Sequence, residues 1–139
     1  MKQKIYRRHF LAPVILLFIS CAIFIPGYSD YASAKRHYTI RQYDAAVFSV
    51  SNSLRIKPKN PKGINLLESA YPLAIHGHKS KIEKLEEVTD KSKWPKLVVE
   101  YEALQKLGTI VQFLKPILKN SANYILKLNV EDYSYKLKE

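Results

Sequence analysis

Glycine is scarce in this chain. Only four of its 139 residues are glycines, and three of them follow residue 30. Few positions can therefore adopt a positive φ without strain. From residue 30 onward, no stretch alternates apolar and polar residues with a period of two for long enough to predict a sheet. These two shortages argue against a β-rich domain and predict an all-α protein.

Cysteine is scarcer still, since Cys21 is the only one. A single cysteine excludes a disulfide within the chain and a zinc site built on several thiolates. His76 and His78 flank one glycine in what we expect to be a turn, and two ligands need a third that converges on the same point. The chain also has no glycine-rich phosphate loop. We therefore expect no enzyme activity, no metal site and no cofactor.

Acidic residues are few beside the basic ones, with 12 Asp and Glu against 23 Lys and Arg and a formal net charge of +11. Four basic residues precede the first apolar run, which leaves 19 against 12, a formal +7, for residues 21–139. Such a charge favours anionic lipid, acidic protein or nucleic acid as a partner. Six lysines fall in two groups: Lys57, Lys59, Lys62, and Lys79, Lys81, Lys84. Each group is either a solvated surface or a patch suited to an anionic membrane.

One long apolar run stands out against this polar background, and it lies at the N-terminus. Residues 1–10 are basic and residues 11–20 are apolar, which is typical of a secretory signal. The apolar run continues to Ile25, and its 15 residues would span about 22 Å as a helix, less than the ~30 Å hydrocarbon core. We interpret residues 1–20 as a signal peptide, or residues 8–26 as a membrane anchor.

Three outcomes at this segment stay open. The stretch FISC resembles the bacterial lipobox, which implies cleavage before Cys21 and attachment of lipid to its thiol. Cleavage after Ala34, in the sequence ASA, also fits the small-residue rule but would remove half of the first predicted helix. The third outcome is an uncleaved anchor. If the chain is lipidated or keeps its anchor, we expect residues 21–29 to form a spacer. The protein would then be exported and attached to a membrane of the bacterial envelope, where we expect no nucleic-acid partner.

The spacing of apolar residues predicts a helical domain over residues 30–139. Small and apolar residues recur every three or four positions on one helical face, at Tyr43, Ala46, Val50, Ser53 and Leu54. Pro58 should end this helix, since a residue before proline avoids the α region. Asn60 and Pro61 are typical of the start of the next helix. Pro72 would kink or end that helix.

The later helices are predicted from weaker patterns. A fourth helix over residues 78–90 would begin with Ser80 and Glu83 as a capping box. A fifth would begin near Asp90 or Ser92 and end near Gly108. Its buried side would hold Trp94, Leu97, Val98, Tyr101, Leu104 and Leu107. A last helix would run from Ser121, with contacts from Tyr124, Leu128 and Tyr135.

The first hairpin resembles the tetratricopeptide repeat, a helical hairpin with a period near 34 residues. Ala34 holds the small-residue position of its first helix. Ala46, Val50, Ser53 and Pro58 hold the positions of its second helix and closing proline. The first-helix pattern returns around Tyr71 and again around Trp94. The resemblance assigns packing roles to Ala34, Tyr43, Ala46, Val50, Pro58, Leu67, Tyr71, Trp94, Leu97 and Tyr101.

This resemblance implies a short α-solenoid of antiparallel hairpins, similar to bacterial envelope lipoproteins in which long helices follow one repeat. Such repeats bind partners on the concave face that their first helices line. In this chain that face would include Arg36, Tyr38, Ile40, Asn65 and Ser69. We expect a membrane-tethered scaffold or adaptor that binds other envelope proteins. The alternative is a small single-span membrane protein whose helical tail serves as a subunit of a larger complex.

Overall fold

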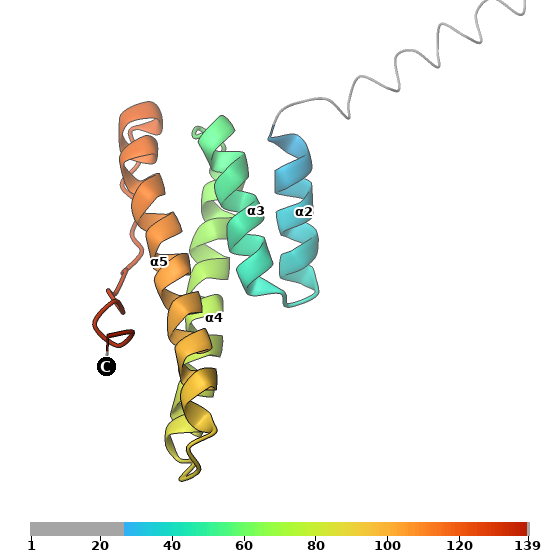
Figure 1. Ribbon diagram of the computed structural model, residues 1–139. Helices are drawn as coiled ribbons and strands as arrows, with labels where there is room; N and C mark the ends of the chain where they lie inside the picture. The colour runs from blue at the N-terminus through green and yellow to red at the C-terminus, as the bar shows by residue number, and fades with distance from the viewer. Residues whose placement is uncertain (1–26, 139) are drawn as a thin grey trace, which may run out of the picture.

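Four helices make up the part of the chain that the computed structural model describes, residues 27–138. They are α2 (Tyr28–Thr39), α3 (Tyr43–Ile56), α4 (Pro61–Glu86) and α5 (Lys93–Ala122). Each runs antiparallel to the next, as Figure 1 shows. Because these residues contain no strand, the all-α prediction is confirmed for them. The predicted signal peptide and Cys21 lie outside the described residues.

Helices α2 and α3 form the first hairpin. Ala34 and Ala46 are fully buried between them, and their small side chains let the two helices approach closely. Tyr38, near the end of α2, packs edge-on against Tyr43 at the start of α3, with ring centroids 5.7 Å apart. The small residues that the sequence singled out therefore lie inside this hairpin, and Tyr43 packs at the turn that closes it.

The turn between these helices contains a strained backbone. Arg41 has a φ of 61°, in the left-handed region that non-glycine residues rarely adopt. Its N–H donates to the Tyr38 carbonyl, and the N–H of Gln42 donates to the His37 carbonyl. This pair of bonds is the Schellman arrangement, in which glycine usually holds the left-handed position.

The start of α2 is fixed against the end of α3 at Gly27, which has a φ of 80°. A Cβ at Gly27 would lie 3.4 Å from both the Cβ of Ile56 and the carbonyl oxygen of Ser53. The Ser53 hydroxyl donates a 2.7 Å hydrogen bond to the Gly27 carbonyl, and Ser53 itself is fully buried. The first described residue is thus held at one end of the helical domain.

Helix α4 is longer than the sequence predicted. It runs through Pro72, and Ser80 and Glu83 lie within the helix instead of capping a new one. The predictions of a break at Pro72 and a separate fourth helix are therefore wrong. A proline within a helix removes one hydrogen bond and costs about 3 kcal/mol. Burial of Tyr71 and Ala74 on either side of Pro72 offsets this cost, while Pro72 points to solvent.

Helix α5 is likewise longer, since it continues through Gly108 and Pro116. The predicted end near Gly108 is wrong. The predicted burial of Trp94 and Val98 is also wrong: Trp94 is 60% exposed, and Val98 is exposed as well. Both lie where α4 and α5 project beyond the first hairpin (Figure 1), so only one neighbouring helix is available to cover α5 there.

This projecting part, residues 79–99, is called the arm below. Ile82 and Leu97 of the arm are buried with Leu104 and Tyr133 in a small cluster that is separate from the main core. The main core lies among all four helices and is built largely of alanine, valine and leucine. The arm therefore has its own apolar support and extends away from the first hairpin as a continuous pair of helices.

The C-terminal residues do not form the helix predicted from Ser121. After Ala122 the chain runs back beside α5 without helix (Figure 1). Leu126 and Tyr133 are buried, whereas Tyr135 is exposed. Gly108 permits this close approach, because a Cβ there would lie 3.0 Å from Cγ1 of Val130. The last segment of the chain thus covers the apolar side that α5 would otherwise expose.

Candidate binding groove along helix α4

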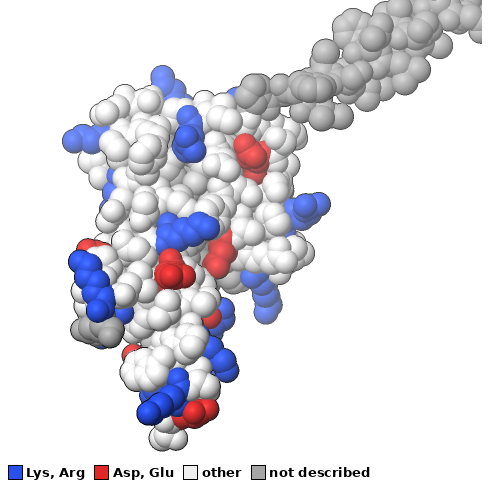
Figure 2. Space-filling view, in the orientation of Figure 1, with Lys and Arg blue, Asp and Glu red and all other residues white. Residues whose placement is uncertain are grey.

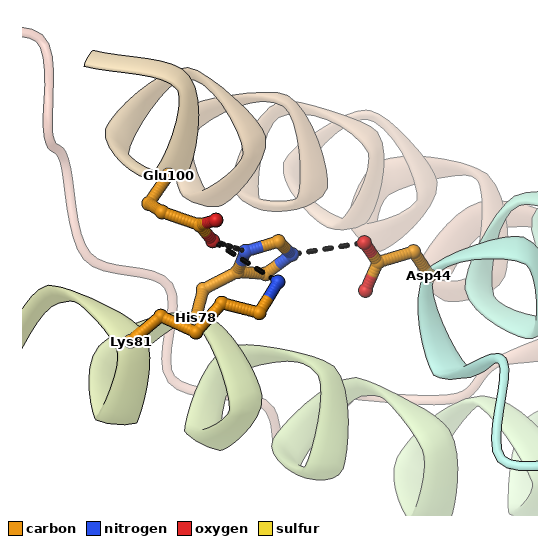
Figure 3. Close-up of polar contacts among 4 residues, drawn as sticks. All are labelled: Asp44, His78, Lys81 and Glu100. Atoms are coloured by element: carbon orange, nitrogen blue, oxygen red, sulfur yellow. Dashed lines mark hydrogen bonds and ion pairs between the residues drawn. The ribbon is translucent and has the colours of Figure 1, made fainter. Parts of the chain in front are cut away.

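His78 lies where three helices meet. Its Nε2 is 2.9 Å from Oδ2 of Asp44 at the start of α3, and its Nδ1 is 2.5 Å from Oε2 of Glu100 in α5. Lys81, one turn further along α4, reaches the same oxygen of Glu100 at 3.4 Å. Figure 3 shows the imidazole ring held between the two carboxylates. The ring joins the first hairpin to the arm.

Both hydrogen-bond partners of this ring are carboxylate oxygens, which accept hydrogen bonds when ionised. The two bonds coexist only when both ring nitrogens carry a proton, so this geometry favours the charged imidazolium. The hydrogen bond to Asp44 is the largest cause that raises the pKa of His78 above its ordinary value. Burial opposes this rise, and the bond to Glu100 adds to it.

The expectation that His76 and His78 occupy a turn is wrong, because both lie within α4. His76 is exposed, whereas His78 is only 7% exposed and bound by carboxylates. In residues 27–138, no group of three or more His, Cys, Asp or Glu side chains is arranged to hold a metal ion. The chemistry of His78 is that of a buried ion pair.

A hollow of about 420 Å³ opens beside His78. One wall is the α2–α3 turn with the start of α3, residues 41–45, and the other is the face of α4 that carries Leu73, Gly77 and Lys81. Gly77 contributes no side chain, and a Cβ there would meet nothing within 4 Å. Space is therefore available beside α4 at the junction of the hairpin and the arm.

A second hollow, of about 550 Å³, lies between α4 and α5 on the arm. It is lined by Lys81, Lys84, Leu85, Pro95, Lys96, Val99 and Glu100. Because Lys81 lines both hollows, they adjoin, and together they are called the α4 groove below. Apolar side chains from Leu73, Leu85 and Val99 line this groove, and it is edged by more cations than carboxylates.

The partner face predicted from the sequence lies elsewhere on the surface. Arg36, Ile40, Asn65 and Ser69 are exposed, and Tyr38 is half-buried against Tyr43. None of the five lines either hollow of the α4 groove. Asn65, Ser69, Leu73 and Gly77 are spaced by four residues, however, so they follow one face of α4 toward the groove.

The predicted packing residues are mostly buried. Ala34, Ala46, Val50, Leu67, Tyr71 and Leu97 are in the two cores. Tyr43, Pro58 and Tyr101 are half-buried. Burial, followed by the nearby Tyr133 and Glu131, raises the pKa of Tyr71 to about 12, so its hydroxyl keeps its proton. Trp94 alone of the ten is exposed, at the tip of the arm.

The residues that form the groove were missed by sequence reasoning, and so was the role of His78. Asp44 and Glu100 lie 34 and 22 residues from His78 in the chain. The three residues lie in three different helices, so no local spacing in the sequence indicates that their side chains meet. The one available signal was the pair of lysines, Lys81 and Lys84, which we interpreted only as part of a basic cluster.

No protein-family model, curated protein or solved structure matches this chain. Among residues 27–138, the longest helices are also too polar to cross a bilayer, so no candidate transmembrane span occurs in them.

Proposed function

We propose that this protein is a membrane-tethered helical adaptor that binds another envelope protein in the α4 groove. The tether is the N-terminal segment, by lipid on Cys21 or by an uncleaved anchor over residues 8–26. The basic and then apolar sequence of residues 1–25 supports the tether. The helical domain supplies the binding surface, and we propose no catalytic step.

The first hairpin is proposed to be a tetratricopeptide-like unit that serves as the base for the arm. This proposal is supported by Ala34 and Ala46, which are buried at the repeat's small-residue positions and let two antiparallel helices approach closely. The two helices that follow, at 26 and 30 residues, are about twice as long as the helices of this hairpin, at 12 and 14 residues. In this scheme one repeat-like hairpin carries one long hairpin.

The α4 groove is the observation that carries the binding proposal. Its apolar lining can bury side chains of a partner segment, which is the main source of affinity at such sites. Arg41, Lys81, Lys84 and Lys96 surround it, with Asp44 and Glu100 already engaged by His78. The partner segment that fits is therefore an acidic, amphipathic peptide.

Site-specific photocrosslinking tests this surface in the native envelope. A photoreactive residue at Val99, inside the groove, should crosslink to one partner, and mass spectrometry should place the adduct on an acidic segment. The matched control is Val88, an exposed valine near the end of the arm that lines neither hollow. A third probe at Ile40 reports on the face predicted from the sequence. Adducts at Val88 or Ile40 but not at Val99 would place the binding surface outside the groove.

Charge variants test the chemistry of the partner. Lys81→Gln, Lys84→Gln and Lys96→Gln combined should abolish most of the adduct at Val99. The control carries the same charge change at exposed lysines away from the groove: Lys91→Gln, Lys127→Gln and Lys138→Gln. Equal adduct yields from the two triple variants would rule out charge recognition in the groove.

The tether is tested separately by intact-mass spectrometry of membrane-extracted protein. Loss of residues 1–20 with added acyl mass is the result expected for lipid on Cys21, and an unmodified full-length mass is expected for the anchor. Cys21→Ala should then block processing in the first case only. If the chain stays in the soluble fraction with either residue at position 21, the protein is not tethered.

A further inference from the structure

One end of the helical domain is strongly basic. It comprises the start of α2, the α3–α4 turn and the end of α5, residues 27–31, 55–63 and 113–123, and is called the basic end below. These residues include six basic side chains and one acidic one, Asp30. Figure 2 shows blue side chains around the upper end of the molecule, whereas red and blue side chains mix in its middle.

Two observations place these three segments at the same end of the domain. Gly27 at the start of α2 lies against Ile56 and Ser53 at the end of α3. The α3–α4 turn and the end of α5 share a hollow of about 490 Å³, lined by residues 57–60 and Ser121. The α3–α4 turn and the end of α5 therefore lie side by side at this end of the domain.

Exposed apolar side chains accompany this charge. Phe113 in α5 is 64% exposed and Ile56 at the end of α3 is 51% exposed, and Tyr28 at the start of α2 is exposed as well. The guanidinium of Arg55 lies 6.0 Å from the centroid of the Phe113 ring. Aromatic and aliphatic side chains among basic ones are typical of surfaces that lie in the headgroup region of a membrane.

The basic end is also where the N-terminal segment joins the domain, because Gly27 is the first described residue. If Cys21 carries lipid, the chain takes six residue steps from it to Gly27, which allows a separation of at most about 20 Å. The basic end is thus the part of the domain that the tether brings closest to the membrane. This step rests on the tether proposed above.

We propose that the basic end docks on anionic lipid headgroups, so that the arm points away from the membrane and the α4 groove remains open to a partner. Charge complementarity and the position of Gly27 favour this occupant over an acidic protein. Lys57, Lys59 and Lys62 bind the headgroup phosphates, while Ile56 and Phe113 enter the interface. The lipid surface orients the domain as well as retaining it.

The single tryptophan allows a direct test, because Trp94 marks the tip of the arm, opposite the basic end. The full chain is inserted into nanodiscs that contain brominated lipids, which quench nearby tryptophan. Wild type reports on the arm, and the double variant Trp94→Phe with Ile56→Trp reports on the basic end. Both positions are exposed, so neither substitution disturbs a core.

The proposal expects quenching of I56W to be roughly threefold stronger in nanodiscs with phosphatidylglycerol than in phosphatidylcholine alone, because several lysines face the charged surface. The quenching should fall in about 1 M salt, where the Debye length is about 3 Å. Trp94 should stay unquenched in both lipids. Equal quenching of I56W in the two lipids, or quenching of Trp94 instead, would overturn the proposal. The partner of the basic end would then be an acidic protein.

Two further measurements test docking and tethering independently of the tryptophan variants. Amine labelling of the wild-type chain should show that Lys57, Lys59 and Lys62 are protected in anionic nanodiscs. Lys84 and Lys91, which lie on the arm, should be labelled. Labelling of the basic end that does not depend on lipid charge counts against docking. A chain that fails to remain with any nanodisc refutes the tether instead. If the chain stays with the nanodisc but quenching and labelling at the basic end do not change with lipid charge, only the docking proposal is refuted.

Discussion

Replacing His78 with alanine removes a side chain that joins α3, α4 and α5 at the root of the arm. The variant loses a 2.9 Å hydrogen bond to Asp44 and a 2.5 Å bond to Glu100. The two carboxylates are affected differently. The Asp44 side chain is 50% exposed and regains water, whereas the Glu100 side chain is only 15% exposed.

The expected loss of stability follows mainly from Glu100. Hydrogen bonds to charged groups contribute about 1.5–3 kcal/mol each, and removing one partner of a fully buried ion pair costs about 3–5 kcal/mol. Because Lys81 still reaches Glu100 at 3.4 Å, the upper value does not apply. We expect His78→Ala to lower the free energy of unfolding by about 2–4 kcal/mol.

The sign of the pH dependence follows from the raised pKa of His78. In the unfolded chain the imidazole titrates at its ordinary pKa, near 6.5. The stabilisation is therefore complete below about pH 6.5 and is lost as pH rises through the higher pKa of the folded protein. One proton is involved, so the slope is at most about 1.4 kcal/mol per pH unit. His78→Ala should abolish this loss.

Urea unfolding between pH 5.5 and about 9, followed by circular dichroism, measures both effects. His76→Ala is the matched control, an exposed histidine in the same helix, and should change stability by less than about 0.5 kcal/mol. If both variants lose similar stability, or if the wild type gains stability relative to His78→Ala as pH rises, the ring is not a buried imidazolium and the reasoning fails.

Three other substitutions have defined outcomes in the same unfolding assay. Ser53→Ala should cost about 1–3 kcal/mol because it leaves the Gly27 carbonyl without its donor, whereas Ser51→Ala, whose buried hydroxyl has no partner among the described residues, should cost nothing or stabilise. Arg41→Gly should stabilise by about 0.5–1 kcal/mol by relieving the left-handed backbone, and should weaken crosslinking at the groove. Gly108→Val should cost about 1–3 kcal/mol and expose the C-terminal segment to protease. Equal losses from both serine variants, a destabilised Arg41→Gly or a protease-resistant Gly108→Val would contradict the respective argument.

The first hairpin was predictable because its information is local. The end of α3 followed from Pro58, and the start of α4 followed from Asn60 and Pro61, all of which act on neighbouring residues. Burial of Ala34 and Ala46 followed from their small side chains at the crossing positions. These features do not depend on what the distant parts of the chain do.

The long helices were less predictable because tertiary packing overrides local signals there. Pro72, Gly108 and Pro116 disfavour a helix, yet α4 and α5 continue through them. Gly108 shows the reason most clearly. Its missing side chain makes room for Val130, so the residue that we interpreted as a helix end serves to dock the C-terminal segment. The α4 groove depends on the same unbroken helices and could not be foreseen without them.

The length of α4 separates the two basic surfaces of the chain. From Lys62 at the basic end to Lys81 in the groove, the helix rises by about 28 Å at ~1.5 Å per residue. This distance is several times the Debye length of about 8 Å at physiological salt. A membrane that binds the basic end therefore leaves the charge of the groove almost unscreened by lipid and available to an acidic partner. The His78 ion pair joins α3, α4 and α5 beside the groove, so weakening it should reduce partner crosslinking while leaving lipid docking intact.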